Sequence, residues 1–418
     1  MKNEILTNLP DLSAATIAHW EPTWTHNSSV NRPRLLEGLD SGTIHCLSRH
    51  PKEPFKTGLI LGSGVSADDI DWNFIAAHRD RVYLLCATSN MSIPLKHGIT
   101  PDAAMVVDAS PMCGTVHIDD IGGPRATRHI ELFAPPIIDP SLIDRWRGPM
   151  YIYRPHQPGN HFLESVLPKM YSKKTTVDVS YHYYTDRLQI GILNAGCVAN
   201  GCVLVGNYLG LRPIGLLGMD WGWSTPKGRA TQYTLDRKSK TWTPYPFHPI
   251  LSGELLHASR HPGLYTTLEM LQYKLNMFIV WRLSEGLPLY LTSNTGLLRD
   301  DEMPRADLTD LIINRESAIA NYPITGEALS LHIDACLERM GIVPPKPPLS
   351  TGIVTSAPPT VVSTTSPLET SAPVYATTTQ IPLDFELINQ PSTTIVDSRA
   401  LSALKALTTE PLTTYRSS

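Results

Sequence analysis

Short apolar segments recur along residues 56–300, and each is followed by a polar turn and then by a stretch with helical spacing. The first three, residues 58–61, 81–86 and 103–107, carry apolar side chains on successive rather than alternate positions. Such strands are typical of a parallel sheet covered on both faces, because side chains on both of its sides are buried. The pattern therefore predicts buried strands that alternate with helices.

The same alternation continues toward residue 300. Further strands are expected at residues 129–133, 149–153, 213–217 and 288–291, and helices at residues 196–209 and 265–283. An apolar stripe at helical spacing runs along the second of these helices: Leu268, Leu271, Leu275 and Ile279. The predicted fold class is α/β, with a Rossmann-like, mostly parallel sheet that has helices on both faces.

Composition divides the chain into four parts. Residues 1–55 have weak periodicity and are read as a small N-terminal extension, and residues 56–300 as the Rossmann-like nucleotide-binding and catalytic domain. Within that domain, residues 224–262 have few apolar runs, which is typical of an insertion or lid. Residues 301–343 are expected to form C-terminal helices, with a terminal helical pair over residues 307–340. Almost half of residues 344–418 are Pro, Ser or Thr, so we expect a disordered tail.

Charge and cysteine content narrow the function class. The net charge is −4, and no Lys/Arg-rich run provides a surface for nucleic acid or an anionic membrane. The N-terminus lacks the apolar core of a signal peptide, and no apolar stretch approaches the length of a membrane span. The six cysteines are scattered without a CxxC pair. We therefore expect a cytoplasmic protein that binds neither nucleic acid nor membrane.

The turn Gly62-Ser63-Gly64-Val65-Ser66 follows the first predicted strand and precedes a helix. Glycines let backbone N–H groups approach a phosphate closely, and a helix N-terminus favours an anion. We interpret Gly62, Ser63, Gly64 and Ser66 as donors to a nucleotide phosphate. The alternative is a simple glycine-containing turn with Ser66 as the N-cap, since neither GxGxxG nor a P-loop is present.

Other polar residues stand where strands end or helices begin, at the edge where ligands of open α/β sheets bind. Asp108 follows a buried strand and could hold a ribose, a sugar or a metal ion, or could cap the helix from Pro111. Asp220 has Gly218 and Gly222 on either side and is followed by Trp221 and Trp223, whose indoles could stack on a base or sugar. The remaining candidates for nucleotide contacts are Asn90, Asn194, Gly196, Ser293 and Asn294.

Several common catalytic motifs are missing. The sequence has no GxSxG elbow, no HExxH and no paired-cysteine zinc site. His248, His257 and His261 lie in the predicted insertion without metal-ligand spacing. The sequence therefore argues against a hydrolase or a zinc enzyme.

Five stretches, in this order, resemble the family that includes the Maf flagellin glycosyltransferases and the archaeal 6-hydroxymethylpterin diphosphokinase-like proteins. They are "LILGSGVS", "HGITPDAAMVVDASP", "NAGCVANGCVLVGNYLGLRPIGLLGMDW", "LYTTLEMLQYKLNMFIVW" and "LYLTSNTGLL". The Maf resemblance implies transfer of a nonulosonic acid sugar from a CMP-linked donor to Ser or Thr hydroxyls of a protein. The pterin branch implies ATP-dependent pyrophosphoryl transfer with Mg²⁺.

The strand end "VVDASP" looks more like the Maf pattern, so the first reading is a glycosyltransferase. In it the glycine turn holds the donor phosphate, Asp108 the ribose or sugar, and Asp220 a sugar or acceptor hydroxyl, with Asp220 as the candidate base. In the diphosphokinase reading, Asp108 and Asp220 would hold Mg²⁺. The third reading is a non-catalytic nucleotide-binding assembly protein.

Overall fold

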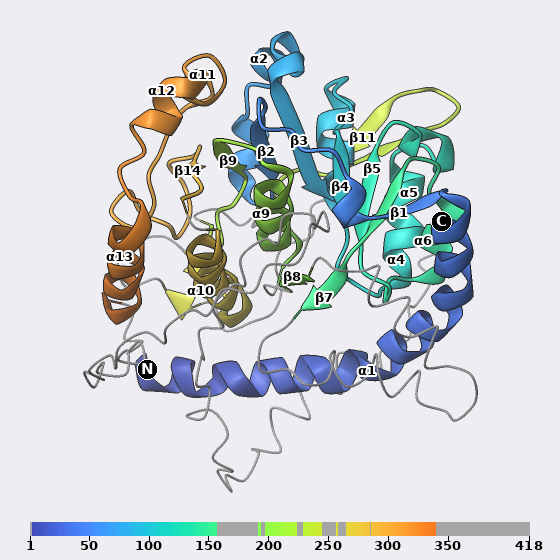
Figure 1. The fold of residues 1–418 in the computed structure, drawn as a ribbon, viewed down its shortest axis with the longest axis horizontal. Coiled ribbons are helices and arrows are strands. Elements are labelled where there is room, and N and C mark those ends of the chain that lie inside the picture. Colours follow the sequence, from blue (N-terminus) through green and yellow to red (C-terminus); the bar gives the residue numbers. More distant parts are fainter. Residues whose placement is uncertain are drawn as a thin grey trace, which may run out of the picture. The chain divides into compact units, whose positions relative to one another are not determined.

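The computed structural model describes residues 2–156, 191–193, 197–223, 229–244, 256–257, 265–284 and 286–339 (Figure 1). The chain divides into two compact units, Met1–Pro344 and Pro345–Ser418, and every described residue belongs to the first. The predicted tail at residues 344–418 therefore lies outside the described residues.

An eight-stranded sheet forms the centre of the first unit. Its strand order is β1-β6-β5-β4-β3-β2-β9-β14, and all seven neighbouring pairs are parallel. In that order the strands are β1 (Ile44–Cys46), β6 (Met150–Ile152), β5 (Glu131–Ala134), β4 (Ala103–Met105), β3 (Val82–Ala87), β2 (Thr57–Leu61), β9 (Ile214–Leu217) and β14 (Leu289–Leu291). β2 and β3 are buried at every position, which confirms the strand type inferred from their unbroken apolar runs.

The other described strands form two-stranded ribbons. They are β7 (Arg154–His156) with β8 (Gly191–Leu193), β10 (Tyr233–Leu235) with β11 (Trp242–Pro244), and β12 (Leu256–His257) with β13 (Tyr265–Thr266). The helices are α1 (Lys2–Ser41), α2 (Trp72–Ala77), α3 (Ser92–Lys96), α4 (Pro111–Gly114), α5 (Val116–Asp120), α6 (Pro140–Arg145), α9 (Val198–Leu209), α10 (Leu268–Leu283), α11 (Leu308–Ile312), α12 (Arg315–Ala320) and α13 (Gly326–Arg339). None of the described helices combines the length and the apolar character needed to cross a bilayer.

Helices cover both faces of the sheet, as predicted. Side chains of successive strand residues point to opposite faces, and in β9 Ile214 contacts Gly206 of α9 whereas Gly215 contacts Leu311 of α11. α9 and α11 therefore lie on opposite faces. α9 ends at Gly210, whose φ of 83° is left-handed, as expected for a glycine that stops a helix.

The N-terminal extension is far more regular than its sequence indicates. α1 spans 40 residues and contains Pro22 and Pro33, and Figure 1 shows it as a long blue helix that bends. Its buried face is partly polar. Asn27 Nδ2 donates hydrogen bonds to Ala109 O and Ile137 O (3.1 Å each). Asn31, one turn later, binds two carbonyl oxygens in the same way.

Two helical predictions near the C-terminal end are wrong in detail. In α10 the expected stripe ends on Ile279, which is 39% exposed, whereas Met277, Phe278 and Trp281 are fully buried. The buried side of α10 is therefore shifted by about one residue from the predicted apolar stripe, because α10 packs against both α9 and α13. The expected terminal helical pair is three helices, α11, α12 and α13.

A buried histidine rests on one face of the sheet. His50 Nε2 lies 2.8 Å from Glu131 Oε2, and His50 Nδ1 lies 2.6 Å from Pro51 O. Tyr83 also donates a hydrogen bond of 2.5 Å to Glu131 Oε2. Because both neighbours of the imidazole accept hydrogen bonds only, the doubly protonated ring satisfies both. Burial acts to lower the pKa of His50, but Glu131 and Pro51 together hold it above its ordinary value of 6.5.

This ion pair predicts a pH-dependent stability. A raised folded-state pKa means that the contribution is complete below pH 6.5 and is lost as the pH rises through the higher folded value. We expect His50→Gln to remove this loss when the free energy of unfolding in urea is measured between pH 5.5 and 8.5. His129→Gln, at an exposed histidine, is the control. An unchanged pH slope in His50→Gln would contradict the assignment.

Candidate functional site

The strand order reverses between β2 and β9. Strands later than β2 run to one side as far as β6, whereas β9 and β14 lie on the other side. In open α/β sheets this switch point opens a crevice at the carboxyl ends of the strands. The loops after β2, β9 and β14 meet there, so the candidate site is built from Gly62–Ser66, Gly218–Asp220 and Thr292–Gly296.

The glycine turn after β2 packs directly on the loop after β9. Gly62 N and Gly64 N donate hydrogen bonds to Leu217 O and Gly218 O, each 2.7 Å long. A Cβ on Gly64 would lie 2.5 Å from Asp220 Oδ2, and one on Gly62 would collide with Gly218 O. The two glycines therefore permit a close approach between protein segments.

Asp220 is the centre of these contacts. Its side chain is buried, and its Oδ2 accepts a hydrogen bond from Ser66 N (2.8 Å) while Oδ1 accepts one from Ser66 Oγ (2.6 Å). The hydroxyls of Ser293 and Thr295 donate to the same Oδ1, at 3.3 Å each. Gly296, with a φ of 101°, passes against the Asp220 backbone. One carboxylate thus joins the loops of three strands.

These contacts occupy three of the predicted phosphate donors, namely the amides of Gly62, Gly64 and Ser66. Within the part of the chain that the structure describes, the amides of Ser63 and Val65 make no hydrogen bond, and the Ser63 side chain is half-buried. The helix expected directly after the turn is a 3-10 turn at Val65–Asp69, and α2 begins only after the N-cap Asp71. Ser63 and its neighbouring amides are therefore the groups of this turn open to a ligand.

The tryptophans beside Asp220 belong to the core. Trp221 and Trp223 are each only 6% exposed. Trp221 has a φ of 48°, and its carbonyl accepts a hydrogen bond from Thr266 Oγ1. Neither indole offers an open face, which overturns the expected stacking on a base or sugar.

A strap from the predicted insertion crosses the rim over β2 and β3. Ala230 N donates to Ser63 O (2.9 Å), and Thr231 N donates to Asp68 Oδ1 (2.8 Å). Gln232 Nε2 lies 3.4 Å from Asn90 Oδ1, and Asn90 Nδ2 lies 3.4 Å from Leu61 O. Asn90 is therefore a buried link between the end of β2 and the strap.

Asp108 lies on the same edge but farther along the sheet. It follows β4, its side chain is exposed, and its Oδ1 accepts a hydrogen bond from Ser110 N (2.9 Å) just before α4. β4 and β9 are separated by β3 and β2, so three inter-strand steps place their ends about 14 Å apart. Asp108 and Asp220 therefore do not fit a shared Mg²⁺ ion, and the described residues contain no cluster of three metal-ligating side chains.

A buried ion pair that the sequence reading missed supports the loop after β14. Lys274 Nζ lies 2.8 and 3.0 Å from the two Glu302 oxygens and donates to Leu297 O (3.0 Å). Leu297 N in turn donates to Asp220 O (2.7 Å). The available signal was the position of Lys274, three residues after Leu271 on the apolar side of a helix. Asn294, one of the predicted ligand contacts, is exposed and accepts from Arg305.

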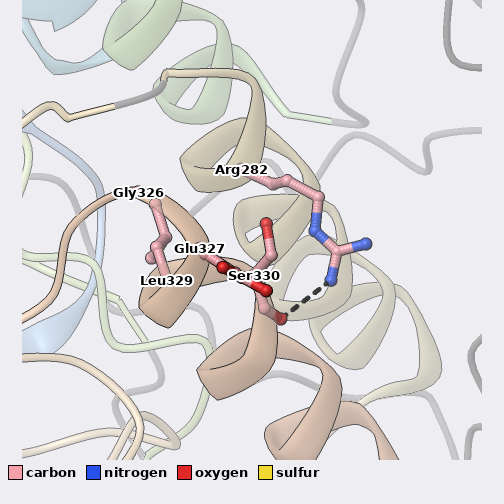
Figure 2. A pocket seen from close by; sticks show the side chains of 5 residues that line it. All are labelled: Arg282, Gly326, Glu327, Leu329 and Ser330. Carbon is pink, nitrogen blue, oxygen red and sulfur yellow. Dashed lines mark hydrogen bonds between the residues drawn. The ribbon is translucent and has the colours of Figure 1, made fainter.

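The remaining predicted residues are not in the described part. Asn194 and Gly196 lie outside it, as do His248 and His261 and the side chain of His257. A separate hollow of about 310 Å³ lies between α10 and α13, lined by Arg282, Gly326, Glu327, Leu329 and Ser330. Figure 2 shows Arg282 reaching across it to Ser330 O. None of its lining residues belongs to the strand-end loops.

A match to a known protein family includes the loops after β2, β4 and β9. Residues 35–226 match the family described as 6-hydroxymethylpterin diphosphokinase MptE-like, a range that holds Gly62, Asp108 and Asp220. No curated protein matches the chain. A solved structure that is similar is that of the Maf glycosyltransferase from Magnetospirillum magneticum AMB-1, with 16% identity and a TM-score of 0.40. The match covers 65% of this chain and 38% of that one.

The two predicted aspartates should differ sharply on amide substitution. Asp220→Asn places an NH₂ group against donors from Ser66, so we expect the free energy of unfolding in urea to fall by about 1–3 kcal/mol. Asp108→Asn, at an exposed side chain, is the matched control and should change it by less than about 0.5 kcal/mol. Equal losses in the two variants would show that Asp220 is not the joint between the loops.

Proposed function

Because residues 35–226 match the 6-hydroxymethylpterin diphosphokinase MptE-like family, we propose that this chain is a transferase that uses a nucleotide-activated donor. The donor lies at the switch point between β2 and β9. The observation that carries the proposal is the turn at Gly62–Ser66 after β2, in which the amides of Ser63 and Val65 have no hydrogen-bond partner among the described residues and Ser63 is only half-buried. Fixed amide and hydroxyl donors of this kind stabilise the charge that develops on a leaving phosphate.

The donor that we propose first is a CMP-linked nonulosonic acid sugar, with a protein Ser or Thr hydroxyl as the acceptor. The basis is the strand end "VVDASP", which follows the Maf pattern. Asp108 projects from the loop after β4 as an exposed carboxylate and would accept hydrogen bonds from ribose or sugar hydroxyls. Ser293 lies beside Asp220 and closes the other side of the donor site.

The second candidate is pyrophosphoryl transfer from ATP, which the description of the matched family favours. A magnesium ion held jointly by Asp108 and Asp220 is not part of this proposal, because the two residues follow strands that are three positions apart. Asp108 remains the carboxylate that could contact a metal carried in by the nucleotide phosphates. All six cysteines are free thiols, which agrees with a reducing cytoplasm as the place of the reaction.

Nucleotide binding tests the proposal and separates the two donors. A ligand at about 100 times its Kd stabilises the folded state by about 2.7 kcal/mol, so the unfolding temperature of the full chain should rise by several degrees. We expect this rise with CMP, but not with UDP or GTP, if the donor is CMP-linked. A rise with ATP alone selects the second candidate. No rise with any nucleotide would contradict both donors.

The turn itself is tested by Ser63→Ala. Loss of one hydrogen bond to a phosphate should weaken binding of the stabilising nucleotide about 10-fold to 100-fold in titration calorimetry. Ser29→Ala, at an exposed serine of α1, is the control and should bind as the unaltered chain does. Unchanged affinity in Ser63→Ala would remove the turn from the donor site.

A further inference from the structure

A second group of polar side chains stands on the same edge, beside the donor site. Thr88 begins the 3-10 turn Thr88–Asn90 that follows β3, and its Oγ1 lies 3.2 Å from His117 Nδ1 on α5. Asn90, at the end of that turn, contacts the last residue of β2. The histidine therefore contacts the turn after β3, the strand that pairs with β2 and its glycine turn.

We propose that His117 is the general base that takes the proton from the acceptor hydroxyl. This inference rests on the proposed function and holds for either donor. As the hydroxyl oxygen bonds to the electrophilic centre, an anomeric carbon or a phosphorus atom, its proton passes to His117 Nε2. The bond from that centre to the donor's bridging oxygen breaks, and its electron pair leaves on the departing nucleotide phosphate.

The hydrogen bonds of His117 suit this role. Thr88 Oγ1 is the hydrogen-bond partner of Nδ1, and a hydroxyl oxygen can accept the proton that Nδ1 carries in one tautomer of the neutral ring. That arrangement leaves the Nε2 lone pair as the base, and among the described residues no side chain or backbone group occupies Nε2.

Burial and the nearby carboxylates act in opposite directions on the protonation of His117. Burial lowers the pKa of His117, so that the ring is neutral at physiological pH and ready to accept a proton. The carboxylates near it are Asp120, on its own helix, and Asp108, from the loop after β4, and both favour the imidazolium once it forms. The cations on neighbouring elements, Arg145 and Arg237, are paired with Asp119.

Asp220, the base candidate from the sequence, is less suited to the task. Its two oxygens accept four hydrogen bonds from Ser66, Ser293 and Thr295, and the residue is 2% exposed. A carboxylate that holds three protein segments together would have to release one of them to accept a proton. His117 has a free nitrogen and needs no such rearrangement.

The test measures release of CMP from a CMP-activated sugar, or of AMP from ATP, by the full chain across pH 5–9. We expect His117→Gln to lower kcat about 100-fold to 10,000-fold while the nucleotide Kd stays unchanged. The acid limb of the kcat/KM profile should have its midpoint at the pKa of His117 measured by NMR, below 6.5, and should vanish in the variant. Thr88→Val should lower the rate and Thr88→Ser restore it. His129→Gln is the matched control.

The outcomes separate this inference from the proposed function. Turnover by His117→Gln within threefold of the unaltered chain, or an acid limb that does not follow His117, overturns the inference and leaves the transferase standing. Absence of turnover by the unaltered chain with either donor overturns both. A parallel loss of nucleotide binding in His117→Gln would make His117 part of the donor site and would also overturn its role as base.

Discussion

The hydrogen bonds of the Asp220 carboxylate are the constraint on which the whole rim depends. A buried carboxylate is costly unless its oxygens accept hydrogen bonds, and no cationic side chain of the described residues pairs with this one. Ser66, Ser293 and Thr295 supply the donors from two different loops. The loops after β2, β9 and β14 therefore close in one arrangement, since moving either donor loop away would leave a buried charge unsatisfied.

A buried ion pair also stabilises the arrangement of these loops. Lys274 and Glu302 pair with side-chain exposures of 8% and 4%, and Lys274 also holds Leu297, the residue bound to the Asp220 backbone. Breaking a buried pair leaves an uncompensated charge, so such pairs specify geometry more than they add stability. The rim is thus rigid on the side of β9 and β14, where a nucleotide phosphate would need donors already in place.

Sequence reasoning located seven strands of the sheet because each has an apolar run, whereas the strand order and its reversal came only from the structure. The strands from 58–61 to 288–291 were found, and Asp220 was correctly placed at a strand end on the crevice side. α1 was missed because the side of the helix that faces the loops after β4 and β5 carries Asn27 and Asn31 in place of apolar residues. Those amides bind carbonyl oxygens of distant loops, a match that no local periodicity reveals.

The contacts of the glycine turn could not be predicted from the sequence. Glycine permits close approach, but the sequence does not say whether a phosphate or another protein segment approaches, and here Gly62 and Gly64 face the loop after β9. His117 was missed for a related reason, since its partner Thr88 follows a strand that is distant in sequence. Only pairing of the strands brings them together.

The two sides of β2 differ in their polar groups, and the proposed transfer reaction would use them differently. Toward β9 and β14 the polar groups are hydrogen-bonded to one another. Toward β3 and β4 lie Thr88, His117 and the exposed Asp108. Neighbouring strands are about 4.8 Å apart, so both sides lie within reach of one pair of reacting molecules. In the proposed reaction, the hydrogen-bonded side toward β9 would hold the leaving phosphate in place while His117, on the other side, accepts the proton of the attacking hydroxyl.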